Sequence, residues 1–172
     1  MTEPAIQERH QDPSNKKAQR YYPLNDSAKI DAVVVHCSDP RFQEAFRRFI
    51  KEELKMEHPA PLVVPGSISS VGLELAMPKH LKTLKDQVAF MLKHGERPRL
   101  VLINHEDCRA YAAFHGKLMH LLLNRQLADL RKAAQIFQKI VPTLSNLPIS
   151  VYMARLDDKK PPEERVYFEK IV

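Results

Sequence analysis

The sequence contains no tryptophan, only two cysteines and no long apolar run. No stretch approaches the roughly 20 apolar residues that a membrane-spanning helix needs, so we expect no membrane partner. The first residues are polar and include no apolar h-region, so we also expect no secretory signal. Without a signal, the two cysteines predict a reducing, cytoplasmic compartment, where buried, catalytic or metal-bound thiols are commoner than disulfides.

Extended tracts of positive charge are also absent, although the formal net charge is +6. The basic residues occur in short pairs such as Lys16-Lys17 and Arg47-Arg48. No aromatic residues alternate with them, as they do in proteins that bind single-stranded nucleic acids. We therefore expect no nucleic-acid partner and interpret most of the charge as solvated helix faces. The positive balance still predicts a surface that weakly attracts anions.

The length and composition predict one folded domain preceded by an arm. The chain has 172 residues and an apolar fraction of 44%, which is ordinary for a single globular domain. Residues 1–28 are polar and contain Pro4, Pro13 and Pro23. They predict an N-terminal arm that is disordered or docks on a partner subunit. Residues 29–172 are expected to form the domain.

Apolar runs alternate with stretches of helical periodicity through this domain. Residues 30–35 and 100–104 are apolar throughout or nearly so, which is typical of strands buried on both faces. A helix is expected from Pro40, with Asp39 as its N-cap. The other expected strands are 62–64, 149–154 and an edge strand at 165–171, and the other expected helices are 71–77, 78–94 and a long one from residue 108 to about 141.

This alternation predicts an α/β fold, with three α/β/α layers around a mainly parallel sheet. In such sheets, ligands bind beyond the carboxyl ends of the strands. Cys37 follows the first long strand, and His105 and Cys108 follow the third. If those strands are neighbours, two thiolates and an imidazole converge, which is a ligand set that zinc accepts in a tetrahedral site.

The spacing His105-x-x-Cys108 is weak support by itself, because a buried thiol near a histidine is the more frequent arrangement. The other cysteine strengthens the interpretation, since Asp39 and Arg41 occupy the next alternate positions. Without the cysteines, Asp39 would be a plain helix N-cap and Arg41 a member of a surface salt bridge.

These two segments resemble a known family. Cys37-Ser38-Asp39-Pro40-Arg41 is similar to the Cys-x-Asp-x-Arg signature of the β-carbonic anhydrases. His105-Glu106-Asp107-Cys108 is similar to their second zinc motif, His-x-x-Cys. The resemblance covers residues 30–172 in the order of elements and implies a β-carbonic anhydrase-like fold.

The resemblance also implies a function. One Zn²⁺ would be held by Cys37, His105 and Cys108, and zinc-bound hydroxide would hydrate carbon dioxide reversibly to bicarbonate. Arg41 would hold the carboxylate of Asp39, which would in turn orient the hydroxide. Asp39 is also a candidate fourth zinc ligand.

The sequence departs from the family at the site. Asn104 and Arg109 occupy positions where the family has glycine, and residues 65–70 replace an Asn-Ala-Gly stretch that normally borders the substrate pocket. One alternative is therefore a related zinc lyase or hydrolase acting on another small linear molecule, such as carbon disulfide. The other is a catalytically silent zinc-binding or regulatory homologue. A pocket filled by Arg109 would favour the silent homologue, and an open apolar cleft would favour an enzyme.

Neighbouring side chains carry weaker expectations. His36 should point away from Cys37, because side chains alternate along a strand. Tyr111 is expected to face either the pocket or the core. Glu106 and Asp107 are either hydrogen-bond acceptors around the site or solvent-exposed residues.

The arm and the edge strand predict a homodimer or a higher even-numbered homo-oligomer, as the family resemblance also implies. Tyr21, Tyr22 and Leu24 could dock on a neighbour, and pairing would protect the edge at 165–171. Size exclusion coupled to light scattering should give at least twice the chain mass, and deletion of residues 1–28 should weaken the assembly. A single peak at the mass of one chain, stable to dilution, would instead indicate a monomer with a guarded edge.

Overall fold

The computed structural model describes residues 20–96, 99–115, 119–140 and 146–172. Most of the expected arm, residues 1–19, lies outside these ranges. Residues 20–28 form no helix or strand, and Tyr21, Tyr22 and Leu24 are exposed. The division into an arm and a domain stays a prediction.

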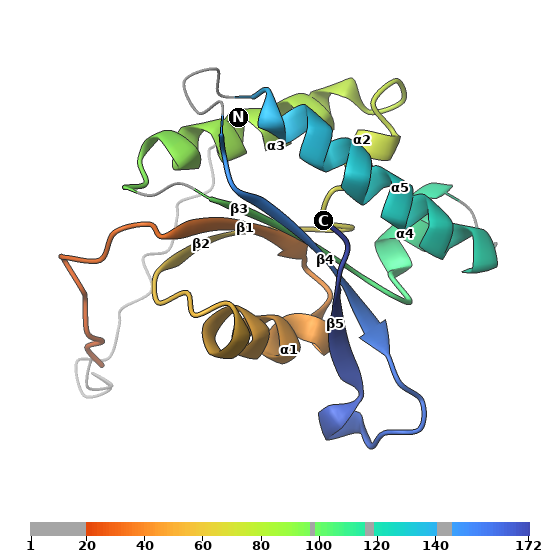
Figure 1. Ribbon diagram of the computed structural model, residues 1–172, viewed down its shortest axis with the longest axis horizontal. Coiled ribbons are helices and arrows are strands. Elements are labelled where there is room, and N and C mark those ends of the chain that lie inside the picture. Colours follow the sequence, from red (N-terminus) through yellow and green to blue (C-terminus); the bar gives the residue numbers. More distant parts are fainter. Residues whose placement is uncertain (1–19, 97–98, 116–118, 141–145) are drawn as a thin grey trace, which may run out of the picture.

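One five-stranded sheet forms the centre of the protein (Figure 1). Its strands lie in the order β2-β1-β3-β4-β5, with β1–β4 parallel and β5 antiparallel to β4. This confirms the mainly parallel sheet and the position of the last strand at an edge. The bounds are β1 Ala32–Cys37, β2 Pro59–Val64, β3 Leu100–His105, β4 Ile149–Leu156 and β5 Val166–Lys170.

Strands β1 and β3 are buried at every position, as their apolar sequences predict. Alternation sends Val33 and Val35 to one face of the sheet and Ala32 and Val34 to the other, so each face has its own apolar cluster. Figure 1 shows most of the helices on the first face and α1 on the second, which gives three layers. The helices are α1 Gln43–Arg48, α2 Ser69–Gly72, α3 Pro78–Lys93, α4 Arg109–His115 and α5 Met119–Gln138.

The helix expected after β1 begins as a 3₁₀ turn over Pro40–Phe42, continues as α1 and ends as a π-helical turn over Phe49–Glu53. Its N-cap is Asp39, whose Oδ1 accepts a hydrogen bond from the Arg41 backbone N–H at 3.0 Å. The capping expected from the sequence is therefore confirmed.

Two expected helices need comment. The long helix expected from residue 108 to about 141 is described as α4 and α5, and residues 116–118 between them lie outside the described ranges. Helix α2 is shorter than the expected 71–77, and turns carry the chain to Pro78 at the start of α3. Over the described residues, every helix falls short of the length or apolar character that a bilayer crossing requires.

The apolar cluster that contains Val33 and Val35 has more buried residues than the one on the other face, so it should contribute more to the free energy of unfolding. Phe137 on α5 is fully buried in it, whereas Phe90 on α3 is 65% exposed. Phe137→Ala should lower the free energy of unfolding by about 3–5 kcal/mol, because it removes buried contacts and leaves a cavity. Phe90→Ala is the matched control and should change it by about 0.5 kcal/mol or less. Urea denaturation measures both, and equal effects would contradict this packing.

Candidate metal centre

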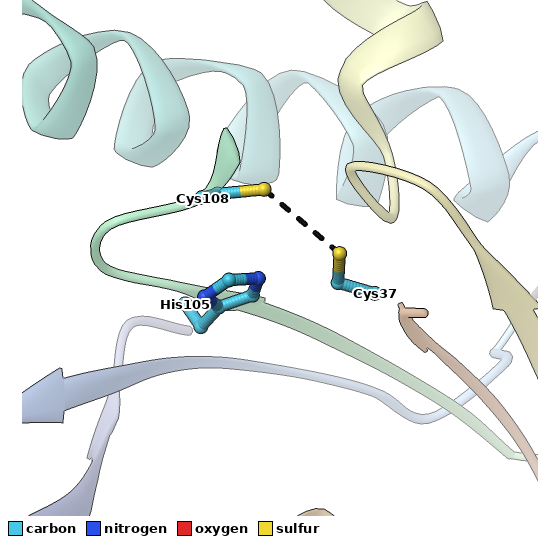
Figure 2. Close-up of side chains that lie close together, drawn as sticks. All are labelled: Cys37, His105 and Cys108. Atoms are coloured by element: carbon cyan, nitrogen blue, oxygen red, sulfur yellow. Dashed lines mark hydrogen bonds between the residues drawn. The ribbon is translucent and has the colours of Figure 1, made fainter. Parts of the chain in front are cut away.

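The three residues expected to bind a metal meet at the carboxyl ends of two central strands of the sheet. Strands β1 and β3 pair in parallel, so their carboxyl ends lie side by side. Cys37 ends β1, His105 ends β3, and Cys108 follows in the turn before α4. Figure 2 shows the three side chains facing one another. Their ligand atoms lie within 4.8 Å of one another and all three residues are buried, so the group could hold a metal ion.

The two sulfur atoms lie 3.9 Å apart (Figure 2). The hydrogen bond from the Cys108 thiol lowers the pKa of Cys37, more than burial raises it. The same hydrogen bond and burial raise the pKa of Cys108. One thiolate is therefore favoured and the second is not, unless a cation compensates the added negative charge. A divalent metal would provide that charge.

The loop after β2 also supports Cys37. The backbone N–H of Gly66 donates a hydrogen bond to the Cys37 sulfur at 3.3 Å. Gly66 has a φ of +72°, and a Cβ at this position would lie 2.7 Å from the Ser69 hydroxyl oxygen. A larger residue here would strain the loop and disturb this hydrogen bond. Glycine therefore fits the position for a steric reason.

The imidazole of His105 is oriented for ligation. Its Nδ1–H donates to the Glu106 carbonyl at 2.7 Å, which leaves the lone pair on Nε2. Within the described ranges, this buried Nε2 has no hydrogen-bond partner. The ring packs on Phe42, with centroids 4.1 Å apart, and Gln126 donates to the His105 carbonyl at 3.0 Å. An unpartnered buried nitrogen beside two sulfurs is the donor set that a metal would complete.

Arg41 connects the two segments that carry the ligands. Its Nε donates to Oδ1 of Asp39 at 3.0 Å, and its Nη2 donates to Oδ2 of Asp39 at 2.7 Å. Its Nη1 and Nη2 also donate to the side chain and the carbonyl of Asp107, at 2.6 Å and 2.9 Å. These hydrogen bonds from Arg41 lower the pKa of Asp39 to about 2. Asp39 is therefore ionised at neutral pH.

The position of Asp39 differs from that of a metal ligand. Both of its carboxylate oxygens accept hydrogen bonds from Arg41. Asp39 also lies outside the group of three residues whose ligand atoms come together. Its candidacy as a fourth ligand stays a prediction.

A cavity of about 340 Å³ opens beside Cys37. Arg109 is exposed and forms part of its wall without filling it. The lining combines charged and polar side chains with apolar ones such as Pro40 and Pro65, so the cavity is neither blocked by Arg109 nor purely apolar. The lining residues are Cys37, Ser38, Asp39, Pro40, Arg41, Pro65, Arg109 and Ala110.

The loop at 65–70 borders two cavities. Pro65 lines the cavity beside Cys37 and also a second one of about 440 Å³ against α3. Ser67, Ser69 and Ser70 line the second cavity. The loop that departs from the family therefore contributes only Pro65 to the space next to the candidate ligands.

The structure also places the neighbouring residues His36, Tyr111 and Glu106. His36 is buried on the other face of β1, where its ring contacts Phe46, so packing is confirmed. Tyr111 lies in the core at 1% exposure and hydrogen-bonds with Asn104 and Asp129. Glu106 accepts from the backbone N–H of Leu156 and pairs with Arg155. Glu106 therefore ties the turn to β4.

Sequence reasoning missed two contacts of the site. The link from Asp107 to Arg41 joins residues 66 positions apart, and no local pattern indicates such a pair. The hydrogen bond from Gly66 to Cys37 was also missed. The Pro65-Gly66 pair after a strand indicated a turn, but it gave no sign of what the turn would contact.

Comparisons with known proteins give a similarity of fold. No protein-family model and no curated protein sequence matches the chain. Among solved structures, the crystal structure of β-carbonic anhydrase isoform I from the protozoan Trichomonas vaginalis is similar, with a TM-score of 0.51. The alignment covers 89% of this chain and 88% of that chain at 12% identity. It confirms the expected α/β fold class.

The geometry predicts about one divalent metal ion per chain. Cys37→Ser, Cys108→Ser and His105→Gln should each lose most of it, because each removes one of three converging ligands. His80→Gln is the control, since His80 is exposed and outside the group. Elemental analysis of purified protein gives the metal and its stoichiometry. Full metal content in the Cys37→Ser, Cys108→Ser double variant would refute this site.

Proposed function

We propose that the chain binds Zn²⁺ through Cys37, His105 and Cys108 and catalyses the reversible hydration of carbon dioxide to bicarbonate. The observation that carries this proposal is the buried Cys/His/Cys group with the Asp39–Arg41 pair beside it. Two thiols and one imidazole match the preference of zinc and leave a fourth position for water. The similarity in fold to a β-carbonic anhydrase supports the same conclusion.

When bound, zinc would lower the pKa of a coordinated water toward about 7 and so supply a nucleophile at neutral pH. Hydrogen bonds from other parts of the chain would orient two of the three zinc ligands. Gly66 donates to the sulfur of Cys37, and the Glu106 carbonyl fixes the His105 ring with Nε2 toward the sulfurs. Such hydrogen bonds orient ligands and typically change metal affinity by about 10–100-fold.

In the proposed reaction, Asp39 orients the attacking oxygen. It lines the same cavity as Cys37, and its side chain is only 9% exposed. Because Arg41 keeps the Asp39 pKa at about 2, the carboxylate is a hydrogen-bond acceptor throughout the neutral range. It can accept a hydrogen bond from a water in the cavity and direct a lone pair of that water toward carbon dioxide. Arg41 acts through Asp39, since its own N–H groups are directed to Asp39 and Asp107.

The charged side chain of Arg109 in the cavity lining favours a second candidate function. A related zinc lyase or hydrolase on this fold could act on another small molecule that forms more hydrogen bonds than carbon dioxide does. The third alternative, a catalytically silent zinc-binding or regulatory homologue, would bind the metal without turnover. Stopped-flow hydration of carbon dioxide by zinc-loaded protein, between about pH 6.5 and about pH 9, separates the proposed function from both.

Variants of the pair test the role of Asp39. Asp39→Asn retains the ability to cap the helix but loses the charge, and Arg41→Ala releases the carboxylate. Both should keep zinc at saturating metal and lower the hydration rate by about 10–100-fold. Arg47→Ala is the matched control, because it breaks an exposed ion pair with Glu44 on the same helix.

Metal content and hydration rate should be measured on the same samples. Unchanged rates in both Asp39→Asn and Arg41→Ala, with zinc present, would remove the pair from the mechanism. No hydration by the zinc-loaded wild type would refute the proposed function itself.

A further inference from the structure

The cavity beside Cys37 is lined by two arginines with different surroundings. The Nε, Nη1 and Nη2 atoms of Arg41 all donate to Asp39 or Asp107. The side chain of Arg109, by contrast, forms no hydrogen bond or ion pair with any residue that the structure describes, and it is exposed. Arg109 is therefore the cation of this cavity whose donors are available to a ligand.

The charges of the lining point the same way. Asp39 and Arg41 neutralise each other through a bidentate ion pair, as their distances show. Apart from the candidate metal ligand Cys37, whose charge a bound divalent metal would balance, Arg109 is the remaining charged residue of the lining, and its charge is positive. A cavity of about 340 Å³ with one uncommitted guanidinium suits a small anion.

The location links this charge to the candidate metal centre. Arg109 directly follows Cys108 in the chain and shares the cavity with Cys37. An anion held by Arg109 would therefore lie in the space that adjoins the metal ligands. The planar fork of a guanidinium matches the two oxygens of a carboxylate or of bicarbonate.

We propose that Arg109 forms an anion subsite in this cavity and binds planar oxyanions of the carboxylate and bicarbonate type. The subsite rests on the proposed function in one respect, because bicarbonate is the product of that reaction. It gives Arg109 a role that glycine cannot fill, and it distinguishes this chain from the family pattern at that position. The ordinary alternative is that Arg109 is a solvated surface side chain with no ligand.

The test is an NMR titration of zinc-loaded, ¹⁵N-labelled protein with sodium bicarbonate, and separately with sodium acetate. Sodium chloride at equal ionic strength controls for general screening. The backbone amide of Ala110, which also lines the cavity, reports binding. The variants are Arg109→Gln, which removes the charge, and Arg109→Lys, which keeps the charge but not the fork. Arg131→Gln is the matched control, because Arg131 is exposed on α5 and does not line the cavity.

We expect saturable shifts in the wild type and in Arg131→Gln. Arg109→Gln should weaken binding by roughly tenfold, and Arg109→Lys by less, since the charge-assisted pair is lost or reduced. Arg109-dependent binding of both anions would support a general carboxylate subsite, and of bicarbonate alone a bicarbonate subsite. Equal affinities in the wild type and Arg109→Gln, or no saturable binding, would overturn the proposal.

These outcomes separate the subsite from the proposed function. Arg109-dependent binding in a protein that does not hydrate carbon dioxide would refute the function and leave the subsite. Hydration together with Arg109-independent binding would refute the subsite and leave the function. Melting temperatures of all variants check that the exposed substitutions leave the fold intact.

Discussion

The site depends first on the parallel pairing of β1 with β3. Because both strands are central and buried, Cys37, His105 and Cys108 come together at the carboxyl ends of the strands and are themselves buried. Cys37 and His105 are the last residues of those strands, so their backbones are held by the sheet ladder. Rigid strands position ligands more closely than loops do. Only Cys108 depends on the geometry of a turn.

Arg41 supplies the connection that the sheet does not. It joins Asp39, two residues after the candidate ligand Cys37, to Asp107, one residue before the candidate ligand Cys108. Asp107 has a φ of +53°, a left-handed conformation that costs energy for a residue other than glycine. The ion pairs are partly exposed, so their contribution to stability is small. Their value lies in geometry, since one planar guanidinium fixes the relative position of two segments far apart in the chain.

The same arrangement determines the charge around the cavity. Arg41 neutralises Asp39 and keeps it ionised, which makes the carboxylate an acceptor without making the cavity repel anions. An uncommitted Arg109 adds a positive charge at the position where a glycine would add none. This charge and the Asp39–Arg41 ion pair distinguish the cavity from a purely apolar slot.

The sequence by itself determined the local features: the buried strands from their apolar runs, the helix start from Asp39 and Pro40, and the candidate ligands from their places after strands. These depend on residues within a few positions of one another. The tertiary structure alone decided that β1 lies beside β3, that Asp107 pairs with Arg41, and that Gly66 donates to Cys37. Those contacts join distant segments, and packing of the whole domain selects them because no local preference of the chain favours one distant partner over another.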